Sequence, residues 1–157
     1  MNITLTQKER LLLEDQKKHE ELCIEKYTTY ANQAQDPQLK QLFQQYASQE
    51  QQHLDTVNQM LGGQVPNLQQ QQGQQNQHKQ QSKTMSGLGS SQNNSDASLC
   101  QDMLTTEKYV SGTYDTAIFE FTDPQARQVL NHIQKEEQQH GEGIFNYMQS
   151  HGMYNPK

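Results

Sequence analysis

The amino-acid sequence predicts an all-α fold, a four-helix bundle made of two duplicated helix pairs with a long crossover between them. Two observations predict it. Apolar residues recur at the spacing of a helix rather than that of a strand, and the chain repeats itself at a fixed offset. Sliding the chain by 87 residues lays 12–61 on 99–148 without a gap, with 13 of those 50 positions identical. At 157 residues, the chain has the length of one domain, so we expect 1–157 to form a single bundle.

Local signals place the ends of each expected helix. Thr6 and Glu9 fit a capping box, which opens a first helix. An Asp-Pro step at Asp36, repeated at Asp123, fits an N-cap followed by proline at the first helical position, and it also ends the preceding helix. The expected helices are 7–35, 37–61, 97–122 and 124–150, which form the pairs 7–61 and 97–150.

The segment between the two helix pairs has a different composition. It is rich in Gln, Ser, Gly and Asn and has almost no apolar content, so we expect 64–94 to be a flexible crossover. A loop of this length ordinarily counts against an assignment of helices, but this one falls between the two repeats.

Composition and charge exclude several classes of protein. The net charge is −6 and the Lys and Arg residues are scattered, which argues against a nucleic-acid partner. The chain has no apolar run long enough to cross a membrane, and its start at Met1 lacks the features of a secretory signal, so we expect cytoplasmic synthesis. Cys23 and Cys100 are too few and too far apart for a disulfide framework or a cysteine zinc site.

A Glu-x-x-His pair occurs at equivalent places in the two repeats. Glu50 and His53 are three residues apart on one expected helix, so both side chains project from the same face. Counting from the turn of an antiparallel pair brings Glu20, on the apolar stripe of its helix, level with them. The same relation holds in the second repeat for Glu107, Glu137 and His140.

Six side chains are therefore expected to converge at one height. Their four carboxylates would balance two divalent cations with neutral imidazoles, and an oxygen-rich set with two His suits iron or manganese better than structural zinc. The alternative is a metal-free, hydrogen-bonded polar cluster, which would need several carboxylates to be protonated. The expected metal ligands are Glu20, Glu50, His53, Glu107, Glu137 and His140.

Other polar and aromatic residues lie near the expected ligands. We expect Tyr27, Tyr46 and Tyr114 to be core aromatics whose hydroxyls find partners, with a role beside the ligands as the alternative. Glu136 could compete with Glu137 for its place, whereas Glu142 is expected to face solvent. Four histidines lack matched partners and are expected at the surface: His19, His78, His132 and His151.

The ligand pattern resembles that of a known group of proteins. One Glu from each of two helices and a Glu-x-x-His from each of the other two is the pattern of the ferritin-like di-iron and di-manganese carboxylate proteins. The resemblance implies a ferritin-like bundle in which Glu50 and Glu137 bridge two metal ions that Glu20 and Glu107 cap. It also implies an oxidoreductase acting on small oxygen species such as peroxide, although no catalytic residue is identified.

A narrower resemblance rests on the acidic, Gln-rich, paired-helix texture and on the Glu-Gln-Gln-His block. In these features the chain is similar to the coat protein F family of spore-forming bacteria. That similarity implies synthesis in the mother cell, location in the spore coat, and other coat proteins or further copies as partners. Peroxide reduction, catalase chemistry and ferrous oxidation stay open, as does a structural coat component in which the site is a metal staple or a metal-free remnant.

Overall fold

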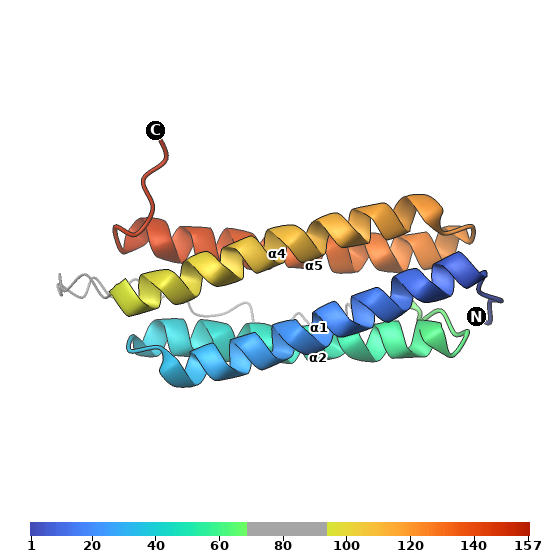
Figure 1. The fold of residues 1–157 in the computed structure, drawn as a ribbon, viewed down its shortest axis with the longest axis horizontal. Coiled ribbons are helices and arrows are strands. Elements are labelled where there is room, and N and C mark those ends of the chain that lie inside the picture. The colour runs from blue at the N-terminus through green and yellow to red at the C-terminus, as the bar shows by residue number, and fades with distance from the viewer. Residues whose placement is uncertain (69–93) are drawn as a thin grey trace.

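The computed structural model describes residues 1–68 and 94–157, and these residues form a four-helix bundle (Figure 1). The fold class predicted from the sequence is confirmed. None of the described helices is long and apolar enough to cross a membrane. The helices are α1 (Gln7–Gln33), α2 (Pro37–Leu61), α4 (Asn94–Glu120) and α5 (Pro124–Ser150).

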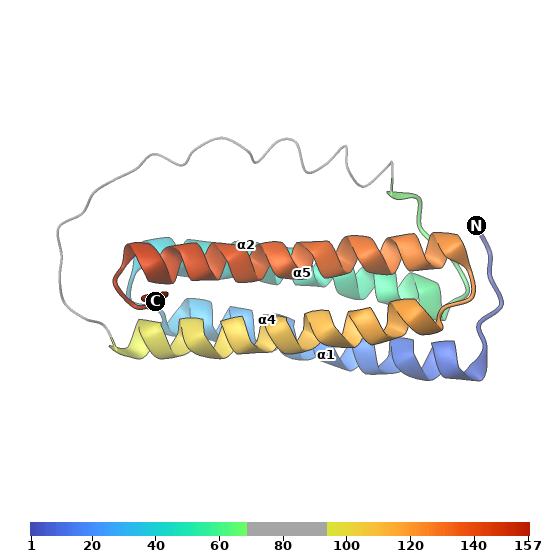
Figure 2. The same cartoon turned by 90° about the horizontal axis from the view of Figure 1, so that it is seen from above.

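The helices are arranged as two antiparallel pairs. α1 turns back into α2, α4 turns back into α5, and the pairs pack so that α1 lies beside α4 and α2 beside α5 (Figure 2). The end of α2 and the start of α4 lie at opposite ends of the bundle. The predicted flexible crossover, 64–94, lies mostly outside the described residues, because 69–93 are not described.

Helix starts follow the capping signals in the sequence. The Thr6 hydroxyl accepts from the Glu9 N–H at 3.1 Å while the Glu9 carboxylate accepts from the Thr6 N–H at 2.7 Å, so the predicted capping box is confirmed. Asp36 caps α2 by accepting from the Gln38 N–H, and Asp123 caps α5 by accepting from the Ala126 N–H. Each cap satisfies a backbone donor that the first helical turn leaves free.

A buried carboxylate near the start of each pair reaches across to the turn of the other pair. Asp96 accepts from the N–H groups of Gln35 and Asp36 at 2.9 and 3.0 Å. Glu9 accepts from the Thr122 N–H at 2.7 Å and from its hydroxyl at 2.9 Å. We call these two contacts, of Asp96 with Gln35 and Asp36 and of Glu9 with Thr122, the end clamps. Glu9 and Asp96 are 87 positions apart, as are Gln35 and Thr122, so the two end clamps are equivalent contacts of the two repeats.

The end clamps explain where the structure departs from the expected helix ends. The N–H of Gln35 bonds to Asp96 and that of Thr122 bonds to Glu9, so neither continues its helix. α1 therefore ends at Gln33, two residues before the expected end, and α4 ends at Glu120 rather than at 122. α4 also begins at Asn94 rather than at 97, with the acidic Asp96 in its first turn, where the helix dipole favours a negative charge.

The core consists of two apolar clusters separated by a polar layer. The first cluster fills the end of the bundle nearest the turn between α4 and α5, and the second fills the end nearest the turn between α1 and α2. Large, fully buried members of the first include Leu13, Met60, Tyr114, Leu130 and Ile133. Those of the second include Tyr27, Leu39, Phe43, Met103 and Ile144. Between them lie side chains that carry charge.

Candidate metal centre

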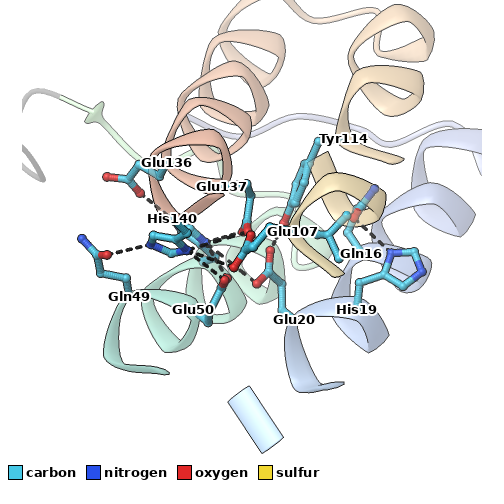
Figure 3. Close-up of polar contacts among 12 residues, drawn as sticks. Gln16, His19, Glu20, Gln49, Glu50, Glu107, Tyr114, Glu136, Glu137 and His140 are labelled. Atoms are coloured by element: carbon cyan, nitrogen blue, oxygen red, sulfur yellow. Dashed lines mark hydrogen bonds and ion pairs between the residues drawn. The ribbon is translucent and has the colours of Figure 1, made fainter. Parts of the chain in front are cut away.

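The polar layer contains all six residues that the sequence predicts as ligands. Glu20 lies on α1, Glu107 on α4, and the two Glu-x-x-His pairs on α2 and α5, so every helix contributes (Figure 3). None of the six side chains is more than 3% exposed. The predicted convergence in space is therefore observed, because four helices of the right register place these groups at one height.

The six residues form two overlapping groups of four. In each group, one ligand atom from every residue lies within 4.8 Å of the others. We call the first group the His53 position and the second the His140 position. Both contain Glu50 and Glu137, so these two carboxylates are placed to be shared. Glu20 and His53 complete the His53 position, and Glu107 and His140 complete the His140 position.

Both imidazoles point Nδ1 toward the carboxylates. Nδ1 of His53 lies 2.9 Å from Glu137 Oε1 and 3.0 Å from Glu50 Oε2. Nδ1 of His140 lies 3.1 Å from Glu50 Oε1 and 3.3 Å from Glu107 Oε1. In each ring, Nδ1 is the atom available to a cation, and Nε2 faces away from the cluster.

Three carboxylate oxygens at the centre have no hydrogen-bond partner among the residues that the structure describes. They are Oε2 of Glu20, of Glu107 and of Glu137, and all three are buried. Buried polar atoms in folded proteins are nearly always paired, since an unpaired one costs free energy. Three such oxygens in one buried cluster are what a cation site would present.

Two tyrosines donate to the carboxylates at the outer ends of the cluster. The Tyr114 hydroxyl donates to Glu20 Oε1 at 2.5 Å, and the Tyr27 hydroxyl donates to Glu107 Oε1. Both rings are fully buried, and each tyrosine belongs to the half of the chain opposite its carboxylate. The expectation that these hydroxyls find partners is met, and the partners are two of the predicted ligands.

Tyr46 contacts the cluster differently. Its ring stacks on His140 with centroids 4.2 Å apart and planes 27° apart. Its hydroxyl fills the space beside Gly143, where a Cβ would lie 1.8 Å from the oxygen. Gly143 is thus the residue that lets Tyr46 cover one face of His140.

Burial and mutual repulsion perturb the protonation of the cluster. Burial, together with the charge of Glu20, raises the pKa of Glu50 and of Glu137 well above the usual range. Burial opposes the charged form of Glu107, but contacts with Glu137 and His140 outweigh it and lower its pKa. Burial also opposes the charged form of His53, yet its carboxylate partners raise its pKa. Without metal, the cluster therefore retains protons that cations would displace.

Two polar side chains contact the outer nitrogens of the histidines, one from Glu136, which the sequence marked only as a competitor of Glu137, and one from Gln49, which it did not mark. Nε2 of His53 lies 2.6 Å from the Glu136 carboxylate. Nε2 of His140 lies 2.7 Å from Gln49 Oε1 (Figure 3). Each immediately precedes a shared glutamate, and the two are 87 positions apart, so the repeat alignment could have pointed to them. Glu136 does not compete with Glu137 for a ligand place.

The remaining histidines differ in part from expectation. His132 is half-buried, with Nε2 3.3 Å from the Glu136 carboxylate, and His19 is half-buried against Gln16 and Thr113. Both therefore remain partly exposed, and each has a polar partner that the sequence did not indicate: His132 one turn along its own helix, and His19 on its own helix and on α4. His151 and Glu142 are exposed, as expected. His78 lies outside the described residues.

The donor set fits a pair of divalent cations. Four carboxylates and two imidazoles offer oxygen and nitrogen ligands of the kind that iron and manganese accept. Two such cations would neutralise four carboxylates and give partners to the unpaired oxygens. The outer contacts, from tyrosine hydroxyls, Glu136 and Gln49, would hold the ligands in orientation.

Part of the chain matches a known protein family. Residues 95–157, which span α4 and α5 almost completely, match the family model described as the Coat F domain. The resemblance to the Coat F family is confirmed. The match covers the second repeat, whereas the first repeat is related to it by the offset of 87 residues.

A solved structure is similar over nearly the whole chain. It is a two-domain protein from Anabaena variabilis containing DJ-1/ThiJ/PfpI-like and ferritin-like domains, and it aligns with a TM-score of 0.68 at 16% identity. The alignment covers 95% of this chain and 38% of that protein, so this chain spans less than half the length of its neighbour. The likeness shows the fold, which is ferritin-like. A comparison with curated proteins found no match.

Proposed function

We propose that this chain is a spore coat ferritin-like protein that binds two iron or manganese ions in a carboxylate-bridged centre. The single observation that carries the proposal is the group of three buried oxygens, on Glu20, Glu107 and Glu137, that have no hydrogen-bond partner among the residues the structure describes. A structural cluster of hydrogen bonds would pair such atoms, whereas a site for cations has to present them.

Each ligand has a role that follows from its place. Glu50 and Glu137 belong to both groups and would bridge the ions, while Glu20 and Glu107 would each bind one ion. His53 and His140 would each add an imidazole Nδ1. The resulting centre is electrically neutral, which removes the large cost of burying four charges together.

The chain's own residues prepare the site for small oxygen species. Two metal ions held by these residues would supply redox equivalents and Lewis acidity. The apolar clusters at both ends of the polar layer limit the access of water to it. Tyr27 and Tyr114 fix the orientation of Glu107 and Glu20 by donating hydrogen bonds to them. We therefore propose peroxide or oxygen as the substrate.

Metal analysis of purified protein tests the binding step. We expect about two iron or manganese ions per chain, and close to none in Glu50→Ala and Glu137→Ala, since each removes a shared ligand. Glu142→Ala is the matched control because Glu142 is an exposed carboxylate on the same helix as Glu137. Wild-type protein that contains no metal after expression in metal-supplemented medium would refute the proposal.

A peroxide-consumption assay separates an enzyme from a structural protein. Turnover by the metal-loaded protein, abolished in Glu50→Ala, would support an oxidoreductase. Full metal content without turnover would favour the alternative, in which the ions join the four helices at mid-length and act as a staple. That alternative is supported by the fact that each position takes ligands from three different helices.

Location in the spore coat follows from the Coat F similarity and is also a proposal. We propose synthesis in the mother cell and, as partners, other coat proteins or further copies of this chain. Tagged protein in a sporulating host should fractionate with the coat layer of purified spores. Recovery of the tagged protein in the spore core would contradict this.

A further inference from the structure

The two metal positions are built from the same ligand types but have different surroundings. Glu20 and Glu107, Glu50 and Glu137, and His53 and His140 are equivalent residues at the repeat offset, so the ligands alone are symmetric. The residues that contact the outer nitrogen of each imidazole are not. One is the carboxylate of Glu136 and the other is the amide of Gln49.

The acceptor on the outer nitrogen changes the imidazole as a ligand. A carboxylate that accepts the Nε2 proton makes the imidazole a stronger donor through Nδ1 than a neutral amide does, and it brings a negative charge close to the cation. At the His53 position, this carboxylate lies 2.6 Å from Nε2 and is itself braced by Nε2 of His132 at 3.3 Å. At the His140 position, Nε2 instead faces the neutral amide oxygen of Gln49 at 2.7 Å.

A second difference also distinguishes the surroundings of the two histidines. The ring of Tyr46 covers His140, whereas the residue equivalent to Tyr46 in the second repeat is Ile133. The space that Tyr46 occupies exists because Gly143 has no side chain, and its equivalent in the first repeat is Thr56. The surroundings of His53 and His140 therefore differ in charge, in aromatic contact and in packing.

We propose that the two positions bind divalent cations unequally, with the His53 position filling first and more tightly because Glu136 is its positioning residue. This inference rests on the proposed metal centre and adds an order of occupancy to it. Partners of this kind change metal affinity by about 10- to 100-fold, so we expect a difference of that size between the positions.

A titration of metal-free protein with Mn²⁺ tests the order of filling. Calorimetry and the Mn²⁺ electron paramagnetic resonance signal monitor the binding. Two binding phases alone are not decisive, because repulsion between two ions would produce them even at equivalent positions. The decisive comparison is Glu20→Gln against Glu107→Gln, which remove equivalent ligands from different positions. We expect Glu107→Gln to keep the tight phase at one ion per chain and Glu20→Gln to lose it.

Substitution of the outer residues completes the test. Glu136→Gln should weaken the tight phase by about 10- to 100-fold, and Gln49→Glu should strengthen the weak phase. Glu142→Gln, which removes the same charge from the exposed face of α5, should change neither phase. Equal effects of Glu20→Gln and Glu107→Gln, or a tight phase unchanged in Glu136→Gln, would overturn the inference. Absence of any Mn²⁺ or Fe²⁺ binding by the wild type would instead refute the metal centre itself.

Discussion

Buried carboxylates occur in two regions of this bundle, and the contrast between them separates a folding role from a binding role. In the end clamps, Glu9 uses both oxygens, one for the Thr6 N–H and the other for the N–H and hydroxyl of Thr122. At the centre of the bundle, Glu20, Glu107 and Glu137 each retain an oxygen without a hydrogen bond among the described residues. Burial alone is therefore uninformative, and the partners distinguish the two uses: the Glu9 oxygens accept from backbone N–H groups and a hydroxyl, whereas the central carboxylates face histidines and one another.

The two regions also respond differently to protons. Burial opposes the charged form of Glu9, but its hydrogen bonds with Thr122 and Thr6 outweigh burial and lower its pKa. Burial and neighbouring carboxylates raise the pKa of Glu50 and Glu137. The clamp carboxylate is thus favoured as an anion, whereas burial and neighbouring carboxylates disfavour the anionic forms of Glu50 and Glu137.

The largest expected effect is that of metal on stability. Free Mn²⁺ at about 1,000 times its dissociation constant should raise the free energy of unfolding by about 4 kcal/mol, because the unfolded chain has no assembled site. Differential scanning calorimetry with and without a chelator measures it. Glu9→Gln should keep this increment and Glu50→Ala should lose it. An equal increment in Glu50→Ala would place the metal elsewhere.

A smaller effect is expected from opening an end clamp. Glu9→Gln leaves one backbone N–H facing an amide donor, so the free energy of unfolding should fall by about 1 to 3 kcal/mol while metal content stays at the wild-type level. Urea denaturation measures the loss, with Glu14→Gln on the exposed face of α1 as control. The clamp role of Glu9 is wrong if the two variants have the same stability.

The smallest expected effect concerns metal-free protein and pH. The pKa of Glu50 and of Glu137 is higher in the folded chain than the value of about 4.5 for a glutamate in the unfolded chain. Above that value, the unfolded chain loses protons that the folded chain keeps, so the free energy of unfolding should decrease as pH rises from about 5 to 8. The raised pKa of His53 acts in the same direction above about 6.5. Glu137→Gln should reduce the slope by at most about 1.4 kcal/mol per pH unit. A stability that rises with pH in wild-type, metal-free protein would contradict this sign.

Much of the fold could be predicted from the sequence because its signals are local or repeated. Thr6, Asp36 and Asp123 mark helix starts by short-range hydrogen bonds, and two copies of a Glu-x-x-His pair indicate one shared site. Counting residues from the turn of each antiparallel helix pair also selected Glu20 and Glu107, which lie in the cluster.

The parts that could not be predicted depend on contacts between the two halves. Gln49 and Glu136 each contact a histidine of the opposite repeat. The repeat alignment pairs these two positions, but helical periodicity within one repeat contains no information about the contacts they make. The helix ends at Gln33 and Glu120 likewise depend on carboxylates that arrive from the other pair. The local sequence around Glu9 predicts only a capping box with Thr6. Its contact with Thr122 depends on the packing of the two helix pairs.

The two similar helix pairs belong to one chain, and this determines whether the residues around the two metal positions can differ. If each pair were a separate chain and the bundle a two-fold symmetric dimer, any residue beside one histidine would necessarily appear beside the other. Because both pairs belong to one polypeptide, position 49 can be an amide while position 136 is an acid. In a single chain, the residues beside the two metal positions do not have to be identical. A single substitution can therefore change one position without changing the other.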